Sequence, residues 1–346
     1  MLLRGVVLLL AVLGIAACGL SEAQEAEDSR SARTIATGLS VPWGVAFLPG
    51  GDALVSERTT GRILRVSPNG RKRTVMQIPG VDTDFGEGGL LGIAISPRYS
   101  GDGFVYAYFT SGSDNRIVRF RLGGRVRPIL TGLRRGVNHD GGRIAFGPDG
   151  KLYAGVGDAG DTDLAQDRRS LNGKILRMNP DGGVPSDNPF GNSLVWTLGH
   201  RNVQGLAWDS AGRLWATEFG QDRFDEVNLI RAGRNYGWPE VEGRGSTDGG
   251  RFTDPAVTWR TSEASPSGAA IRRGTLFIGA LRGEAVLRVG LEGTRARKRP
   301  PLLKGRYGRI RTVQRAPGGA LWVTTSNKDG RGDPRRGDDR IVRLVP

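Results

Sequence analysis

The chain has 346 residues, among them 55 glycines and 18 prolines, and only 7% are aromatic. This composition favours many short strands joined by turns over long helices. The formal charge of +15 comes mostly from arginines spread along the whole chain, which argues against a nucleic-acid partner because nucleic-acid-binding proteins cluster their basic residues. The single cysteine, Cys18, excludes an intramolecular disulfide.

The N-terminal segment is expected to direct export. A short basic start precedes an apolar run that ends at Ala17, which is typical of a signal peptide and too short to span a bilayer comfortably. The small residues before Cys18 resemble the lipobox of bacterial lipoproteins, in which the cysteine is lipidated. We expect a signal peptide at residues 1–17, a lipid on Cys18 that binds the outer face of the cell membrane, and a flexible tether at residues 18–34. An ordinary cleaved signal is the alternative.

The rest of the chain repeats one pattern six times. Each copy has an alternating apolar segment, a turn, a second apolar segment, a loop, and a third segment that reads like Ile-Leu-Arg-Val. This period is typical of one blade of a β-propeller, whereas a β-sandwich would not repeat a single hairpin phrase. We predict one all-β domain over residues 35–346, a six-bladed β-propeller of four-stranded antiparallel blades. The copies begin at Trp43, Leu91, Gly142, Gln204, Gly268 and Arg311.

The loops between these segments carry candidate catalytic residues, because propeller loops converge at the mouth of the central channel. His139 and His200, the only histidines, precede the third and fourth copies and could both face the channel. Histidine suits a general base near neutral pH, although a hydrogen-bonded structural role is the alternative for each. Asp158 ends a strand of the same copy as His139 and could orient its imidazole, or belong only to a turn.

Two further groups of residues could bind ligands. Several arginines enter from different copies, and their convergence would form a pocket for a compact polyanion, although solvated surface positions are the alternative. The stretch from Glu218 to Asn228, continued at Asn235, is rich in oxygen ligands suited to Ca²⁺, but this pattern alone does not identify a metal. The arginines are Arg201, Arg282, Arg309 and Arg311.

Several motifs follow one another in a fixed order over about residues 35–345. The most specific are Gly-His-Arg-Asn-Val-Gln-Gly from Gly199 and Asn-Tyr-Gly-Trp-Pro from Asn235. Together the motifs resemble the soluble quinoprotein glucose dehydrogenase and aldose sugar dehydrogenase family. The others are Gly-Leu-Leu-Gly from Gly89, His-Asp-Gly-Gly-Arg from His139, Val-Gly-Asp from Val156, Gly-Lys-Ile-Leu-Arg from Gly173 and Asp-Glu-Val-Asn-Leu-Ile from Asp225.

This resemblance implies an enzyme. The family fold is a six-bladed propeller, and its cofactor is pyrroloquinoline quinone (PQQ), a planar quinone with three carboxylates that is bound with Ca²⁺. By resemblance, His139 is the general base for the C1 hydroxyl of an aldose, Asp158 supports it, and the hydride passes to PQQ before an external acceptor takes the electrons. Arg201 and Asn202 match the pair at the reactive edge of the quinone.

The resemblance also implies further ligand contacts. Gly220 and Gln221 match the positions whose backbone carbonyls hold the active-site Ca²⁺. Glu226 and Tyr236 match two ligands of a second, structural Ca²⁺. The remaining cofactor-binding positions are Glu87, Arg282, Arg309 and Arg311, of which Arg282 stands where the glucose dehydrogenases carry lysine.

Some positions depart from the glucose dehydrogenases. Glu87 replaces a glutamine, and an acidic group beside an anionic cofactor is unfavourable unless it meets arginine, Ca²⁺ or a proton. Asn138 replaces an acidic neighbour of the catalytic histidine, and Gln221 replaces a proline. Ser246 replaces a carboxylate of the structural Ca²⁺ site, which puts that site in doubt. The stretch 242–267 is short, which favours an open pocket, broad aldose use and a monomer.

Two other functions compete with this interpretation. A non-catalytic extracellular binding propeller is the main alternative, and the presence of His139, Asp158 and all four arginines favours the enzyme over it. A Ca²⁺-dependent propeller lactonase would need a cage of Glu, Asn and Asp side chains from several blades. No such cage can be assembled from the sequence.

Overall fold

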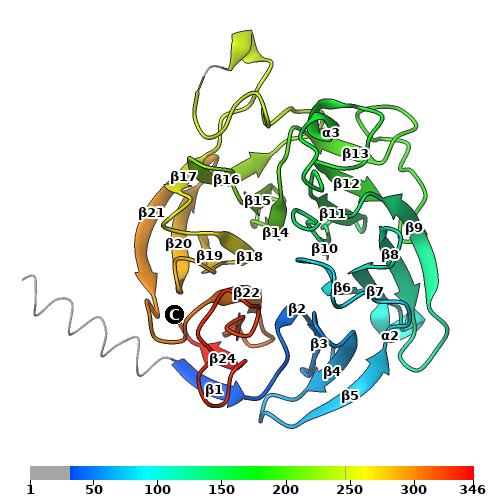
Figure 1. The fold of residues 1–346 in the computed structure, drawn as a ribbon, viewed down its shortest axis with the longest axis vertical. Coiled ribbons are helices and arrows are strands. Elements are labelled where there is room, and N and C mark those ends of the chain that lie inside the picture. Colours follow the sequence, from blue (N-terminus) through cyan, green and yellow to red (C-terminus); the bar gives the residue numbers. More distant parts are fainter. Residues whose placement is uncertain (1–31, 246) are drawn as a thin grey trace, which may run out of the picture.

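The computed structural model describes residues 32–245 and 247–346, which form six four-stranded antiparallel sheets around a common axis (Figure 1). The predicted six-bladed propeller is thereby confirmed. In five of the sheets the four strands follow one another in the chain, because each hairpin turn leads directly to the neighbouring strand.

The innermost strand of each blade comes first in the following order. Blade one contains β2 (Pro42–Phe47), β3 (Ala53–Glu57), β4 (Arg62–Val66) and β5 (Lys72–Gln77). Blade two contains β6 (Leu90–Ile95), β7 (Val105–Thr110), β8 (Asn115–Phe120) and β9 (Arg127–Leu133). Blade three contains β10 (Arg143–Phe146), β11 (Leu152–Val156), β12 (Lys174–Met178) and β13 (Val195–Leu198).

The other three blades complete the ring. Blade four contains β14 (Val203–Trp208), β15 (Leu214–Glu218), β16 (Phe224–Ile230) and β17 (Val257–Arg260). Blade five contains β18 (Pro266–Arg272), β19 (Thr275–Ala280), β20 (Ala285–Glu292) and β21 (Arg295–Leu302). Blade six contains β22 (Ile310–Arg315), β23 (Leu321–Thr325), β24 (Ile341–Leu344) and β1 (Ala32–Ala36).

The two ends of the chain meet in blade six and close the ring. Strand β1 pairs antiparallel with β24, with Ala32 opposite Leu344 and Thr34 opposite Val342. The propeller therefore begins at Ala32, earlier than the expected boundary at residue 35, because this pairing covers the last blade's open edge. The predicted signal peptide and Cys18 lie outside the described residues.

Apolar side chains fill the space between neighbouring blades. One cluster between blades one and two contains Leu54, Ile63, Val105, Ala107 and Val118, which are all buried. Burial on both faces explains why the inner strands read as nearly continuous apolar segments. The blades thereby form a rigid frame whose loops can hold functional side chains in place.

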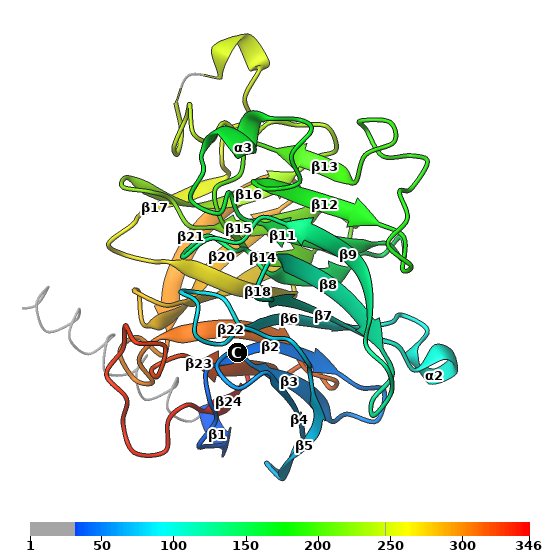
Figure 2. The same cartoon turned by 45° about the vertical axis from the view of Figure 1, so that its right-hand side comes forward.

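Helical structure is sparse in the described part of the chain. It comprises α2 (Tyr99–Asp102), α3 (Asp163–Gln166) and the 3-10 helix η1 (Asp248–Gly250). An arm that carries η1 connects β16 to β17 and projects away from the ring in both views (Figures 1 and 2). Across residues 32–245 and 247–346, no helix has the length and apolar character needed to cross a membrane.

Candidate active site

A histidine and an aspartate form a hydrogen-bonded dyad in blade three. His139 precedes β10 and Asp158 follows β11, and the His139 Nδ1 lies 2.7 Å from the Asp158 Oδ1. The fully buried Asp158 carboxylate also accepts hydrogen bonds from the Gly160 N–H and the Trp238 Nε1–H, each at 2.8 Å. Because a carboxylate only accepts hydrogen bonds, the imidazole donates its Nδ1–H and keeps the Nε2 lone pair for another proton.

The backbone of this loop is unusual. His139 has a φ of 60°, in the left-handed region that residues with a side chain rarely adopt. Its carbonyl oxygen would lie only 1.7 Å from a Cβ at position 157, so Gly157 is required for the two loops to approach. The His139 N–H donates to the Glu87 carboxylate at 3.3 Å. Strained backbone held by such contacts is common at functional sites.

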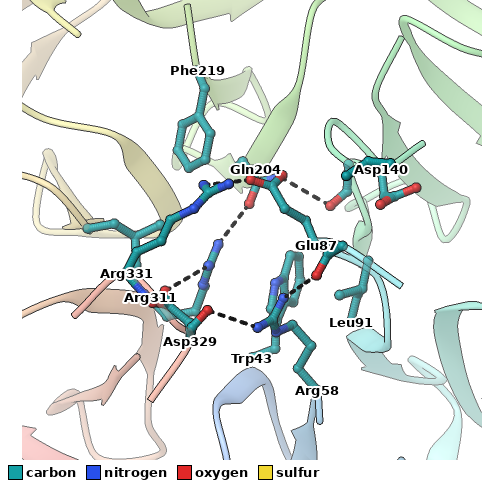
Figure 3. A pocket seen from close by; sticks show the side chains of 14 residues that line it. Trp43, Arg58, Glu87, Leu91, Asp140, Gln204, Phe219, Arg311, Asp329 and Arg331 are labelled. Carbon is teal, nitrogen blue, oxygen red and sulfur yellow. Dashed lines mark hydrogen bonds and ion pairs between the residues drawn. The ribbon is translucent and has the colours of Figure 1, made fainter. Parts of the chain in front are cut away.

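The dyad borders two adjoining cavities on the axis of the ring. The inner cavity has a volume of about 200 Å³ and is lined by Trp43, Arg58 and Arg311, among others. In Figure 3, Arg311, Asp329 and Arg331 lie on one side of this cavity, and Leu91 and Asp140 lie on the other. The outer cavity, of about 420 Å³, is lined by His139, Arg201, Asn202 and Arg282. Glu87, Phe219 and Arg331 belong to both walls.

The inner cavity is rich in cations with unused donors. The Nε atoms of Arg58 and Arg311 are buried and have no hydrogen-bond partner in the described structure. Burial lowers the pKa of Arg311 to about 10, so this arginine stays charged at neutral pH. Arg309, predicted as a cofactor ligand, lines neither cavity and instead binds Asp329 at 3.0 Å. It reaches the site through Asp329, which also lies 3.8 Å from Arg311.

The outer cavity holds the other predicted contacts. Arg201 donates from Nε to the Gln221 Oε1 at 2.9 Å. Asn202 accepts from the Gly141 N–H through its Oδ1, while its buried Nδ2 has no partner among the described residues. Arg282 is exposed on this wall. The structure therefore brings Arg201, Asn202 and Arg282 to the same mouth as His139.

Glu87, the acidic departure, meets an arginine. Its Oε1 lies 2.6 Å from the Arg331 Nη1, so the two side chains form an ion pair between the cavities. This pairing satisfies the condition under which a carboxylate is tolerated beside an anionic ligand. Sequence reasoning did not single out Arg331.

The loop predicted to hold Ca²⁺ is shaped by a carboxylate. The Glu242 Oε1 accepts hydrogen bonds from four successive backbone N–H groups, those of residues 221–224, at 2.7–3.1 Å. The carbonyl oxygens of Gly220 and Gln221 accept none of the hydrogen bonds found in the described part of the chain. These two carbonyls are therefore available to a hard cation.

The predicted structural Ca²⁺ ligands have protein partners. Burial raises the pKa of Glu226 to about 8, and its carboxylate accepts from the Gly243 N–H and the Asn228 side chain. The Tyr236 hydroxyl donates to the Leu229 carbonyl, so only its backbone carbonyl is available. Position 246 lies outside the described residues. The second Ca²⁺ site stays a prediction. No group of three or more His, Cys, Asp or Glu suited to a metal occurs in residues 32–245 and 247–346.

His200 does not belong to the site. It is fully buried, its Nδ1 lies 2.7 Å from Glu218 and its Nε2 lies 2.8 Å from Thr197. Its ring stacks on Tyr236 at 4.8 Å. Both ring nitrogens are used in the protein interior, so the structural alternative holds for this histidine.

Comparison with known proteins adds the family. Residues 39–341 match the sequence profile of the Glucose / Sorbosone dehydrogenase family. The chain belongs to this family. The resemblance recognised from the motifs is thereby confirmed, and the glucose/sorbosone dehydrogenase fold accounts for nearly all of the described residues.

Individual glucose/sorbosone dehydrogenases and related structures are close to this chain. A PQQ-bound aldose sugar dehydrogenase from Streptomyces coelicolor is 56% identical with a TM-score of 0.86, covering 90% of this chain and 96% of that one. Aldose sugar dehydrogenase YliI of Escherichia coli is 29% identical over 84% of this chain and 89% of its own length. Quinoprotein glucose dehydrogenase B of Acinetobacter calcoaceticus is 35% identical over 61% of this chain and 52% of its own length.

Proposed function

We propose that this glucose/sorbosone dehydrogenase oxidises aldose sugars at C1 to the lactone, using PQQ and Ca²⁺. The observation that carries the proposal is the His139–Asp158 dyad at the edge of two arginine-lined cavities. The PQQ-bound state of the Streptomyces coelicolor aldose sugar dehydrogenase supports the choice of cofactor and substrate class. A non-catalytic binding propeller would need the cavities but not the dyad.

The residues present fit a planar quinone with three carboxylates. Buried guanidinium nitrogens without a partner, on Arg58 and Arg311, are suited to carboxylate oxygens. The unpartnered Nδ2 of Asn202 and the cationic Arg201 are suited to a polar quinone edge in the outer cavity. Arg282 adds positive charge at the rim.

The Gly220 and Gln221 carbonyls would hold the Ca²⁺ beside this cofactor. Their loop is held by Glu242, so the two oxygens are positioned before the metal binds. When bound, PQQ accepts a hydride from the sugar C1 and Ca²⁺ polarises the quinone carbonyl as a Lewis acid.

His139 removes the proton that accompanies the hydride. Its neutral imidazole has Nε2 free and takes the C1 hydroxyl proton, and the sugar C1–O bond gains the double-bond character of the lactone. Asp158 fixes the tautomer through Nδ1 and stabilises the imidazolium once the proton has arrived. Trp238 holds the second carboxylate oxygen, so Asp158 cannot rotate away from His139.

The open outer cavity supports broad aldose use. From the short stretch 242–267, only Thr261 and Ser265 line it, and the arm that carries η1 projects away from the ring. We further propose that the protein is an exported monomer, held at the membrane through Cys18 so that its electrons reach an acceptor outside the cytoplasm.

One reconstitution experiment tests this function. Protein lacking residues 1–18 is mixed with PQQ and Ca²⁺, and dye reduction is followed with glucose, xylose and maltose. We expect turnover with at least one aldose, a PQQ-dependent rise in melting temperature, and loss of turnover in His139→Ala. No turnover together with no PQQ-dependent shift would refute the proposal, and PQQ binding without turnover would favour a binding propeller.

A further inference from the structure

One cation occupies a ring of otherwise apolar side chains. The innermost strands place one equivalent residue each at the same level of the central axis, and five of the six are apolar and buried. In blade three this residue is Arg143, which is also buried. All six line a cavity of about 290 Å³ on the axis. The apolar members are Val45, Ile93, Leu206, Ala269 and Val313.

The charge of Arg143 has no counter-ion in the described structure. Its Nε donates to the Gln204 carbonyl at 2.8 Å and its Nη2 donates to the Thr312 hydroxyl at 3.0 Å, but no carboxylate lies within ion-pair distance. Burial lowers the pKa of Arg143 to about 9, which leaves the side chain cationic at neutral pH. The fold accommodates it at a steric cost, since a Cβ at Gly268 would lie 2.7 Å from Nη2. A buried, unpaired cation is unfavourable for folding and suggests a functional reason for its presence.

Arg143 lies directly behind the wall of the inner cavity. Its guanidinium carbon is 4.1 Å from the centroid of the Trp43 ring, and the Arg311 guanidinium carbon is 5.8 Å from the same centroid. Trp43, Gln204 and Arg311 all line the inner cavity, and Arg143 contacts the first two. The Thr312 hydroxyl, which accepts from Arg143, donates to the Trp43 carbonyl at 2.6 Å.

The other cations near this cavity are partly neutralised. Arg331 pairs with Glu87 and Arg309 pairs with Asp329. Arg143 has no such partner, so its field extends into the cavity through protein of low dielectric constant. Reduction of a quinone adds two electrons, and a fixed positive charge nearby favours both the polycarboxylate ligand and its reduced form.

We propose that Arg143 is a positioning and tuning residue that strengthens PQQ binding and raises the midpoint potential of the bound cofactor from behind Trp43. This inference rests on the proposed use of PQQ. It adds a role for a residue that touches neither the sugar nor the dyad. Its effect is electrostatic, so it depends on the charge at position 143 and not on the shape of the side chain.

The test compares three variants of the Ca²⁺-loaded protein. Arg143→Met removes the charge and keeps an unbranched chain, Arg143→Lys keeps the charge, and Ile93→Met alters packing at an equivalent ring position without changing charge. PQQ affinity is measured by quenching of tryptophan fluorescence, and the midpoint potential is measured by spectroelectrochemical titration. Loss of one charge near the cavity is expected to weaken PQQ binding about ten-fold in Arg143→Met and to lower the potential.

The outcomes separate this inference from the proposed function. Wild-type protein that binds no PQQ would overturn the proposed function and the role of Arg143 with it. If wild-type protein binds PQQ, an unchanged affinity and potential in folded Arg143→Met would overturn the role of Arg143 alone. Equal effects of Ile93→Met would also overturn it, because packing would then be the cause. Should Arg143→Met fail to fold, Arg143→Gln provides a neutral, hydrogen-bonding replacement for the same measurements.

Discussion

The His139–Asp158 dyad makes a specific prediction for Asp158→Asn. In the wild type, Oδ1 accepts from the His139 Nδ1–H at 2.7 Å and the Gly160 N–H at 2.8 Å, and Oδ2 accepts from the Trp238 Nε1–H at 2.8 Å. An amide has one oxygen, so its NH₂ must face an N–H whichever way it turns. If it faces Trp238, only the negative charge is lost. If it faces His139, the imidazole must accept at Nδ1 and carries its proton on the catalytic Nε2.

The magnitudes follow from burial. Either orientation leaves a buried donor unpaired, which costs about 1–3 kcal/mol in the free energy of unfolding. For a domain of this size that corresponds to a fall of roughly 2–4 °C in melting temperature per kcal/mol. Loss of the carboxylate charge removes the group that stabilises the imidazolium, so kcat should fall by about 10²–10⁴-fold.

The assay pairs Asp158→Asn with Trp238→Phe. The phenylalanine has no N–H, so the double variant can place its amide NH₂ towards position 238 without a clash. We expect the double variant to regain part of the melting temperature while kcat stays low in dye reduction, with Trp238→Phe alone as the control. Recovery of kcat together with the melting temperature would refute the reasoning, since local packing and not the charge of Asp158 would then limit turnover.

Three more predictions concern the cavities. Burial raises the pKa of Asp140, on the inner wall, to about 6; its carboxylate therefore destabilises the fold and repels an anionic ligand increasingly as pH rises through 4–6. PQQ binding, measured by fluorescence, should strengthen from pH 7.5 to 5.5 in the wild type and lose most of this dependence in Asp140→Asn. Glu87→Gln frees Arg331 and should tighten PQQ binding, with a change of under about 1 kcal/mol in the free energy of unfolding because the pair is partly exposed; weaker binding would contradict this. Glu242→Ala removes the acceptor of the loop 221–224 and should raise the Kd for Ca²⁺ at least about ten-fold by calorimetry, whereas an unchanged Kd would show that the loop holds its shape alone.

The blade architecture was predictable because it is local. Each blade repeats hairpins whose turns and alternation lie within about fifty residues, so the pattern is visible without knowledge of the fold. The closure of blade six was not predictable in the same way. Strand β1 finds its partner β24 at the other end of the chain, and its few residues resemble the polar segment before it.

The site was only partly predictable for a related reason. Motifs identified His139 and Asp158, but burial alone separates the free His139 from the structural His200. Arg58 was missed because its neighbour Asp329 is 271 residues away in the chain, and only the closed ring brings them together. Arg143 carried a signal in the aligned repeats, since a cation replaces an apolar residue at one ring position.

Blade six joins the closure of the ring to the cofactor cavity. Strand β22 supplies Arg311, and the segment after β23 supplies Asp329, which holds Arg309 and lies near Arg311. That segment is fixed by the buried Asp339, whose Oδ1 accepts from the Asn327 N–H at 2.6 Å and whose Oδ2 accepts from the Val41 N–H at 3.2 Å. Because Val41 follows directly on β1, the contacts that seal the ring also position the cations of the inner cavity. Strand β1 is therefore a support of the proposed cofactor site as well as the edge of a sheet.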